Sequence, residues 1–199
     1  MISTLELEIT FHGPFPLVAD RGDSVLREDV ATEQGIYIWA VPIEENYLPY
    51  YIGETGKSFT DRLQSHLKEY LSGVYRIYEP TEFIRGKKVL IWHGMWLPGT
   101  KDKMPEFLNE YFWLAPKIYE FIQTLQIFLV PIICETRIRK RIEGAIAKCL
   151  YDHQKEHGKI FIEEEDRNRL CRRTDNEKPI KLRILHGERI DGLASELIL

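Results

Sequence analysis

Two runs of β-branched and aromatic residues, followed closely by an amphipathic helix, constrain the fold of this chain more than any other feature. The first run covers residues 36–41 and is opened by Gly35, and the second covers residues 50–53. Such side chains favour extended strands. The polar segment from Pro42 to Pro49 lies between them, so the pattern predicts a hairpin with a long loop.

The helix after the hairpin is predicted from its cap and from the spacing of its apolar residues. Ser58 is a favourable N-cap, and Asp61 lies in the first turn, where a negative charge is stabilising. Apolar residues then recur at helical spacing to about residue 72. On another side of this helix Arg62 and His66 are four residues apart, so their side chains point the same way.

Further strands are predicted on both sides of this unit. The alternating run over residues 2–12 predicts an N-terminal strand, and the apolar run over residues 126–134 predicts a third strand next to the hairpin. Pro131 favours an edge position or a bulge for that strand, because proline cannot donate to a ladder. A short strand is expected over residues 180–186.

Two further helices are predicted. Residues 105–123 form a strongly apolar helical region that Pro116 is expected to interrupt. Residues 135–153 form the clearest long helix, with Arg139 and Glu143 predicted to lie off its buried stripe.

The first of these two helical regions carries an aromatic cluster within residues 111–121. Aromatic side chains could stack on nucleic-acid bases. At helical spacing, however, they are more often part of a hydrophobic core. We therefore predict that the core contains Tyr111, Phe112, Trp113, Tyr119 and Phe121.

Composition places the chain among soluble globular proteins. It is 44% hydrophobic and 29% charged, and it has neither an apolar run of the roughly 18 residues that cross a bilayer nor a basic N-terminal leader. We expect a cytoplasmic protein with no membrane partner. The few, widely spaced cysteines, Cys134, Cys149 and Cys171, are expected to be reduced thiols.

The ordered set Gly35-Ile36-Tyr37, then Tyr51-Ile52-Gly53, then Arg62 on the next helix resembles the core of the GIY-YIG endonuclease family. Both tripeptides match letter for letter. The resemblance covers about residues 34–72 and 126–154. It implies an α+β fold in which a small three-stranded antiparallel sheet is flanked by helices, and it implies metal-dependent hydrolysis of phosphodiester bonds.

The resemblance also implies a division of the chain. Residues 34–154 would form the GIY-YIG-like nuclease domain, with a helical insertion at about 74–125. Residues 1–33 would form an N-terminal strand and loop, and residues 155–199 a C-terminal extension.

Roles for individual residues follow from the resemblance. Tyr37 would help to deprotonate or orient the attacking water, and Arg62 would stabilise the pentacovalent phosphate. Glu143 would hold a single Mg²⁺ or Mn²⁺. Because the ordinary pKa of tyrosine is near 10, the role of Tyr37 would need a nearby cation, and His66 is a competing base. The supporting polar groups would be Tyr51, Lys57 and His66.

The sequence departs from the family pattern in one respect. Family members carry an asparagine a dozen or more residues after the metal glutamate, whereas here the early part of that region is Asp152-His153-Gln154, and the first asparagine is Asn168. The metal glutamate itself has basic neighbours of a kind that suit a DNA-facing helix, namely Arg137, Arg139, Lys140 and Arg141.

The sequence therefore predicts an endonuclease that acts on DNA, with RNA as the alternative substrate. One site of this kind cuts one strand, so cutting both strands would require a homodimer or sequential nicking. The net charge of −4 favours a second hypothesis, a nucleic-acid-binding module without turnover. A third hypothesis is a protein-interaction domain whose main surface is the apolar region 105–130.

Overall fold

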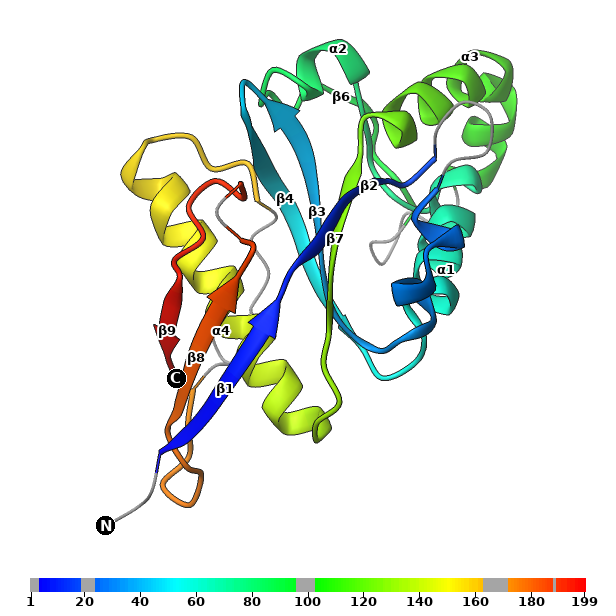
Figure 1. The fold of residues 1–199 in the computed structure, drawn as a ribbon. Helices are drawn as coiled ribbons and strands as arrows, with labels where there is room; N and C mark the ends of the chain where they lie inside the picture. Colours follow the sequence, from blue (N-terminus) through cyan, green and yellow to red (C-terminus); the bar gives the residue numbers. More distant parts are fainter. Residues whose placement is uncertain (1–3, 19–23, 96–102, 163–171, 188) are drawn as a thin grey trace.

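The computed structural model describes residues 4–18, 24–95, 103–162, 172–187 and 189–199 (Figure 1). Two short 3-10 turns, Val25–Arg27 and Asp29–Thr32, lie near its beginning. In chain order the strands and helices are β1 (Leu5–Thr10), β2 (His12–Pro16), β3 (Gly35–Ile43), β4 (Asn46–Thr55), α1 (Phe59–Leu71), β5 (Ile77–Tyr78), α2 (Pro80–Phe83), β6 (Leu90–Trp92), α3 (Met104–Gln123), β7 (Gln126–Pro131), α4 (Thr136–Glu156), β8 (Ile180–Leu185) and β9 (Glu196–Ile198).

The largest sheet has four strands in the order β2-β7-β3-β4, and every neighbouring pair is antiparallel. The α+β class is thus confirmed. The three strands predicted around the tyrosine motifs are β3, β4 and β7, and β2 from the N-terminal segment adds a fourth. A separate two-stranded sheet joins β5 to β6.

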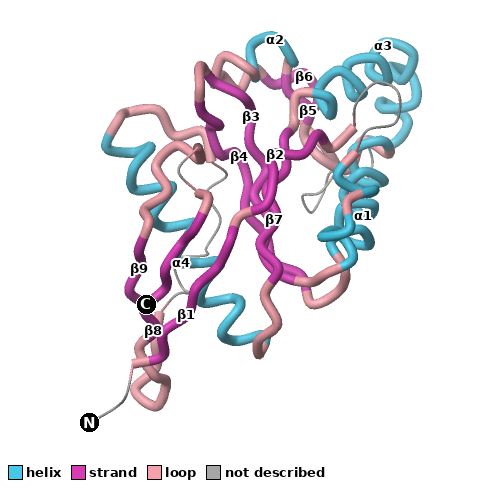
Figure 2. The backbone as a smooth tube through the Cα atoms, in the orientation of Figure 1, coloured by secondary structure: helices cyan, strands magenta, loops and turns pink. Residues whose placement is uncertain are grey.

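Helices cover both faces of this sheet, as Figure 2 shows. Because side chains alternate along a strand, Tyr37 and Trp39 of β3 face α1 and α3, whereas Ile36 and Ile38 face α4. All four side chains are buried. The two faces therefore belong to two separate hydrophobic cores on either side of one sheet.

The connection between β3 and β4 is shorter than predicted. Ile43 pairs with Asn46, which leaves a two-residue turn in which Glu44 has a φ of 51°. The expected long loop from Pro42 to Pro49 is wrong, because both prolines lie within strands. Pro49 is tolerated because β4 is the edge strand and because the register shifts at this point, where a proline costs no ladder bond.

Two further prolines also behave differently from the prediction. α3 continues through Pro116. The proline ring is exposed, so the carbonyl that loses its donor, that of Phe112, lies on the solvent side of the helix. Pro131 does not mark an edge strand: β7 lies between β2 and β3, and Pro131 is its last residue.

The helix signals at α1 are confirmed, and those at α4 are confirmed in part. The Ser58 hydroxyl accepts a 3.0 Å hydrogen bond from the Asp61 amide, as an N-cap should. α4 forms where it was predicted, but Arg139 and Glu143 are buried rather than off the stripe. The prediction followed apolar side chains only, whereas this helix also buries polar groups against β4.

The aromatic residues of α3 are the clearest failure of the core prediction. Phe121 is buried, but Tyr111, Phe112, Trp113 and Tyr119 are exposed. Apolar residues surround most of this helix, so spacing alone could not show which side is covered by the rest of the chain.

The two ends of the described chain form a sheet together. β1 pairs in parallel with β8, and β9 pairs antiparallel with β8. This small sheet shares a hydrophobic core with α4 and with one face of the large sheet (Figure 1). Strands from the predicted N-terminal and C-terminal extensions therefore pack on the central domain and on each other.

An ion pair ties the start of α4 to the segment before β8. Arg137 Nε donates to a Glu177 carboxylate oxygen at 2.6 Å, and this interaction holds the pKa of Glu177 at about 2. A lowered pKa means that the stabilisation is complete above the ordinary carboxyl value and is lost as the pH falls towards 2.

We therefore expect an NMR titration of the Glu177 side-chain carbonyl to show a midpoint near 2 in the wild type. In Arg137→Gln the midpoint should move towards the ordinary carboxyl value. A wild-type midpoint at the ordinary value would show that the pair does not form in solution.

Two expectations from composition concern membranes and thiols. No helix within the described ranges has the length and apolar character that crossing a membrane requires. Cys134 and Cys149 are free thiols, as predicted. Cys171 lies outside the described residues.

Candidate functional site

The two motif tyrosines lie side by side on the α1 face of the sheet. Tyr37 is fully buried, and its ring centroid is 6.1 Å from that of Tyr51. Gly53 pairs with Tyr37 across the ladder, and a Cβ at this glycine would lie 2.4 Å from the Tyr37 ring and hydroxyl. The glycine of the second motif is therefore needed because the Tyr37 ring lies directly over it.

α1 brings two more predicted residues to the same place. Arg62 Nε donates to the Tyr37 hydroxyl at 3.1 Å, and the same hydroxyl is 2.9 Å from His66 Nε2. On its other side, His66 Nδ1 is 3.1 Å from the hydroxyl of Tyr75. We call these five residues the tyrosine cluster: Tyr37, Tyr51, Arg62, His66 and Tyr75.

The tyrosine cluster contains an unbroken chain of hydrogen bonds. A neutral histidine donates through one ring nitrogen and accepts through the other. His66 can therefore accept from Tyr37 and donate to Tyr75, or the reverse. Either arrangement connects the Arg62 guanidinium to Tyr75 through two exchangeable protons.

The environment of Tyr37 keeps its phenol protonated. Burial raises its pKa well above the ordinary value, and the neighbouring Tyr51 raises it further, while Arg62 opposes both effects only in part. The arginine predicted to ease ionisation is thus present, but desolvation outweighs it. At neutral pH Tyr37 is therefore a neutral phenol that acts through its hydrogen bonds and not as a standing phenolate.

Trp39 adds a polar group that the sequence did not single out. Its ring centroid is 5.1 Å from that of His66, and the side chain is buried. Its indole Nε1 has no hydrogen-bond partner among the residues that the structure describes. Leaving a buried donor of this kind unsatisfied is costly.

Two of the predicted site residues, Lys57 and Glu143, are not part of the tyrosine cluster. Lys57 lies just before α1, where its amide donates to the Thr55 hydroxyl at 3.0 Å and its side chain is exposed. Glu143 is buried on α4. It belongs to the helix that packs on the other face of the sheet from α1.

Two contacts fix the position of α4 along β4. Arg139 Nε donates to a Glu54 carboxylate oxygen at 2.5 Å, and the Gln154 amide donates to the Pro49 carbonyl at 3.0 Å. Glu143 lies one turn after Arg139 and between these two contacts, so it faces β4 along the segment that ends in the second motif.

The basic residues around Glu143 do not form an open surface. Arg137 binds Glu177, Arg139 binds Glu54, and Arg141 donates to the backbone carbonyls of Lys178 and Leu199. Each of these three arginines is thus engaged within its own chain, and a DNA-facing role for this helix stays a prediction.

Gln154, which lies where the family pattern would begin to place its asparagine, has a structural role. The Gln154 side-chain oxygen accepts hydrogen bonds from the amides of Phe161 and Ile162, at 2.7 and 2.8 Å. Gln154 thus connects the segment after α4 to β4. Asn168 lies outside the described residues.

Several residues of the site carry no sequence signal. Tyr75 follows α1 in an irregular segment, and only the tertiary fold brings it to His66. The Arg139–Glu54 pair joins residues 85 positions apart. Trp39 could have been found, since it lies two residues after Tyr37 on the same face of β3.

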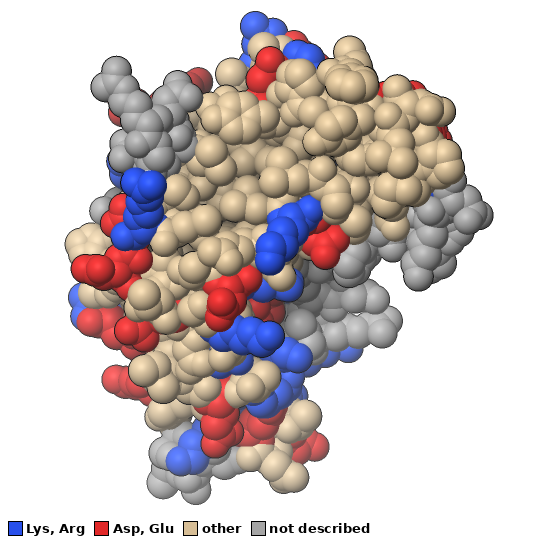
Figure 3. All heavy atoms as spheres, turned by 90° about the vertical axis from the view of Figure 1, so that its right-hand side faces the viewer, with Lys and Arg blue, Asp and Glu red and all other residues tan. Residues whose placement is uncertain are grey.

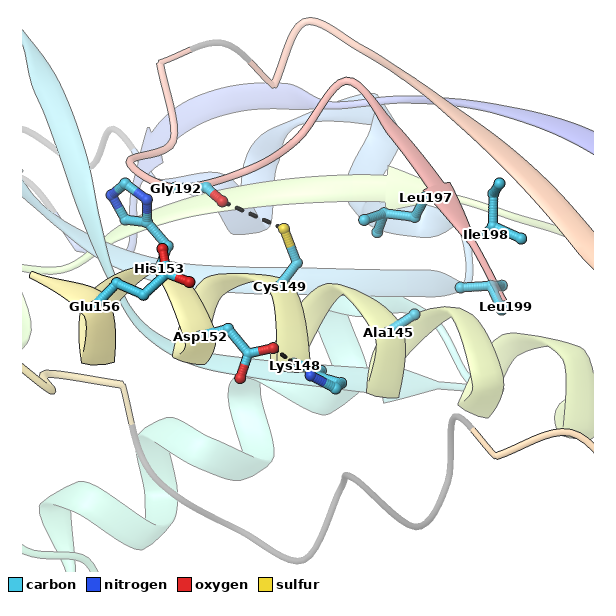
Figure 4. A pocket seen from close by; sticks show the side chains of 10 residues that line it. All are labelled: Ala145, Lys148, Cys149, Asp152, His153, Glu156, Gly192, Leu197, Ile198 and Leu199. Carbon is cyan, nitrogen blue, oxygen red and sulfur yellow. Dashed lines mark hydrogen bonds and ion pairs between the residues drawn. The ribbon is translucent and has the colours of Figure 1, made fainter.

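A cavity of about 480 Å³ lies elsewhere, between α4 and the C-terminal strand (Figure 4). Its lining includes Lys148, Asp152 and His153, and Cys149 Sγ donates to the Gly192 carbonyl there. No residue predicted for the active site lines it, so it is separate from the tyrosine cluster.

No protein-family model matches this sequence, and comparisons with curated proteins and with solved structures give no match either.

Proposed function

We propose that this protein is a metal-dependent endonuclease of the GIY-YIG type that hydrolyses phosphodiester bonds in DNA. The observation that carries this proposal is the hydrogen-bond chain from Arg62 through Tyr37 and His66 to Tyr75. It joins the first tyrosine motif to the following helix, and the ring of Tyr51 from the second motif lies beside it, 6.1 Å from that of Tyr37. We also propose that the sheet and its flanking helices share the fold of that family.

Arg62 is the group that would bind the scissile phosphate. Its guanidinium has five N–H donors, and the Nε donor holds Tyr37. The same guanidinium can present its terminal nitrogens to phosphate oxygens in the fixed, forked geometry that suits them. Tyr37 would then position the arginine that stabilises the developing negative charge.

His66 is the better candidate for accepting the proton of the attacking water. The phenol of Tyr37 stays protonated because burial raises its pKa. Both ring nitrogens of His66 are hydrogen-bonded, Nε2 to the Tyr37 hydroxyl and Nδ1 to the Tyr75 hydroxyl, so a water proton would reach His66 through one of these phenols. In this proposal the water gives its proton to the Tyr37 oxygen while the Tyr37 proton passes to His66 Nε2, so Tyr37 stays neutral and His66 becomes the imidazolium.

Glu143 is the residue that would hold Mg²⁺ or Mn²⁺. No three His, Cys, Asp or Glu side chains gather as a metal site in the described part of the chain. The donor chemistry nevertheless fits, because Mg²⁺ is often held by one or two carboxylates together with waters and substrate phosphates. When bound, such a cation would add positive charge at the phosphate oxygens.

Cleavage assays with supercoiled plasmid, single-stranded DNA and RNA, each with Mg²⁺ or Mn²⁺, test the proposal. We expect the wild type to cut DNA, and Glu143→Ala and Arg62→Ala to lose cleavage. The matched controls are Glu156→Ala on the same helix and Arg85→Ala in the turn after α2, both exposed. Wild type that binds DNA but cuts none of these substrates would replace this proposal with the binding-module hypothesis.

A further inference from the structure

Tyr75 contributes a hydroxyl to the tyrosine cluster although it belongs to neither tyrosine motif. Its oxygen is 3.1 Å from His66 Nδ1, and its ring centroid lies 5.7 Å from that of His66 and 5.0 Å from that of Tyr70. Tyr37 is hydrogen-bonded to the other ring nitrogen of His66. The hydrogen-bond connection between Tyr75 and Tyr37 therefore runs through the imidazole.

The proposed function, on which this inference rests, sets a requirement for His66. The Tyr37 proton passes to His66 Nε2, so this nitrogen must carry no hydrogen before the reaction. A neutral imidazole then has its one hydrogen on Nδ1, and Nδ1–H donates to the Tyr75 oxygen. Only one of the two neutral tautomers is therefore competent.

The hydrogen bonds around Tyr37 favour this tautomer. The Arg62 guanidinium can only donate, so the Tyr37 oxygen accepts from Arg62 Nε. The hydrogen of Tyr37 then has an acceptor in His66 Nε2, 2.9 Å away. If His66 donated instead, two N–H groups would meet one phenol oxygen, and the Tyr37 hydrogen would need another acceptor in the core, such as Tyr51.

Burial along the chain of hydrogen bonds favours the same tautomer. Tyr37 is fully buried and His66 is 4% exposed, whereas Tyr75 is partly exposed. With the hydrogen of His66 on Nδ1, both buried residues donate within the tyrosine cluster, and the last hydrogen belongs to a side chain that water can reach. The reverse order would leave the last hydrogen on the fully buried Tyr37, where an unsatisfied O–H is costly.

We infer that Tyr75 is a positioning residue that holds His66 in the Nδ1–H tautomer and so keeps Nε2 ready to receive the Tyr37 proton. In the imidazolium that results, both ring nitrogens carry hydrogen, and the Tyr75 oxygen still accepts from Nδ1. The same oxygen therefore stabilises His66 before and after the transfer. Tyr75 itself exchanges no proton in this step.

Phosphate binding and the positioning of His66 depend on different groups. α1 carries Arg62 and His66, and Figure 3 faces the side of the molecule on which this helix lies. Lys and Arg side chains, with acidic ones among them, are exposed across the middle of that view. Arg62 is partly exposed, so it can meet a phosphate, whereas Tyr75 acts on the buried His66. Removing the Tyr75 oxygen should therefore affect the chemical step and not the binding of substrate.

Nitrogen-15 NMR of the His66 imidazole, assigned by its loss in His66→Gln, tests the inference. We expect the neutral ring to carry its hydrogen on Nδ1 in the wild type. Tyr75→Phe removes only the oxygen and should shift the ratio of the tautomers towards Nε2–H at least about fivefold, because a buried Nδ1–H loses its acceptor. Tyr119→Phe removes a hydroxyl from an exposed residue of α3, and this matched control should leave the His66 signals unchanged.

Cleavage kinetics test the consequence for the proposed reaction. In Tyr75→Phe we expect kcat to fall about tenfold or more, because fewer molecules hold His66 in the competent tautomer and the imidazolium lacks its acceptor. KM should stay within about twofold, because Arg62 is unchanged. Tyr119→Phe should alter neither constant.

A wild-type His66 with its hydrogen on Nε2 would overturn the inference. An unchanged tautomer ratio in Tyr75→Phe, or an unchanged kcat in a protein that cuts, would do the same. The NMR measurement needs no cleavage, so it separates this inference from the proposed function. A protein that cuts nothing but whose Tyr75 fixes His66 as the Nδ1–H tautomer would keep the positioning role and remove the reaction.

Discussion

Replacing Gly53 with alanine is expected to destabilise the protein by about 1–3 kcal/mol and to reduce cleavage about a hundredfold or more. The added methyl would lie 2.4 Å from the Tyr37 ring and hydroxyl, well inside contact distance. Tyr37 is fully buried, so its ring cannot swing into solvent to make room. Any shift would carry the hydroxyl away from Arg62 and His66.

Urea denaturation and the plasmid assay measure the two parts of this effect. Combining Gly53→Ala with Tyr37→Val removes the ring that the methyl would meet. The two changes should then destabilise the protein by clearly less than their sum, as expected for residues in direct contact. Simple additivity would mean that the alanine acts elsewhere and that Tyr37 does not lie over this position.

Replacing Arg139 with methionine is expected to destabilise the protein by about 3–5 kcal/mol, the cost typical of breaking a buried ion pair. The Arg139 side chain is 5% exposed and that of Glu54 is 17% exposed, and their 2.5 Å contact joins α4 to the end of β4. The substitution leaves the Glu54 carboxylate desolvated without its cation. The measurement is the free energy of unfolding in urea.

The control is an ion pair on the same helix. Lys148 pairs with Asp152, and both side chains are about half exposed, so Lys148→Met should change stability by less than about 1 kcal/mol. Replacing both Arg139 and Glu54 with methionine should recover much of the loss, because no charge is then buried alone. Equal losses in Arg139→Met and Lys148→Met would show that solvent reaches both pairs alike.

Local rules were sufficient for the elements that carry the tyrosine cluster. β3, β4 and α1 were predicted from strand-forming runs, a serine cap and helical spacing. The convergence of Arg62 and His66 on Tyr37 follows from their separation of four residues on α1, and the hydrogen bonds show both side chains at that hydroxyl. These features depend on neighbours within about thirty positions along the chain.

Features that depend on distant partners could not be predicted in this way. Arg139 and Glu143 were placed off the buried stripe because an apolar pattern cannot anticipate a carboxylate such as Glu54 arriving from β4. The addition of β2 to the sheet could not be predicted either, because β2 pairs with β7, which is distant in the sequence. The exposure of Phe112 could not be predicted, because the spacing of apolar residues shows that a helix is apolar but does not show which side other elements cover.

The parallel pairing of β1 with β8 has a consequence for synthesis of the chain. β1 ends at Thr10, and its partner strand begins at Ile180. At ordinary translation rates of about 5–20 residues per second, β1 would wait roughly ten to thirty seconds for that partner. The strands β2, β3, β4 and β7 are all complete by Pro131. During translation the tyrosine cluster can therefore assemble first, while the unpaired edge of β1 stays open to chaperones or to neighbouring nascent chains.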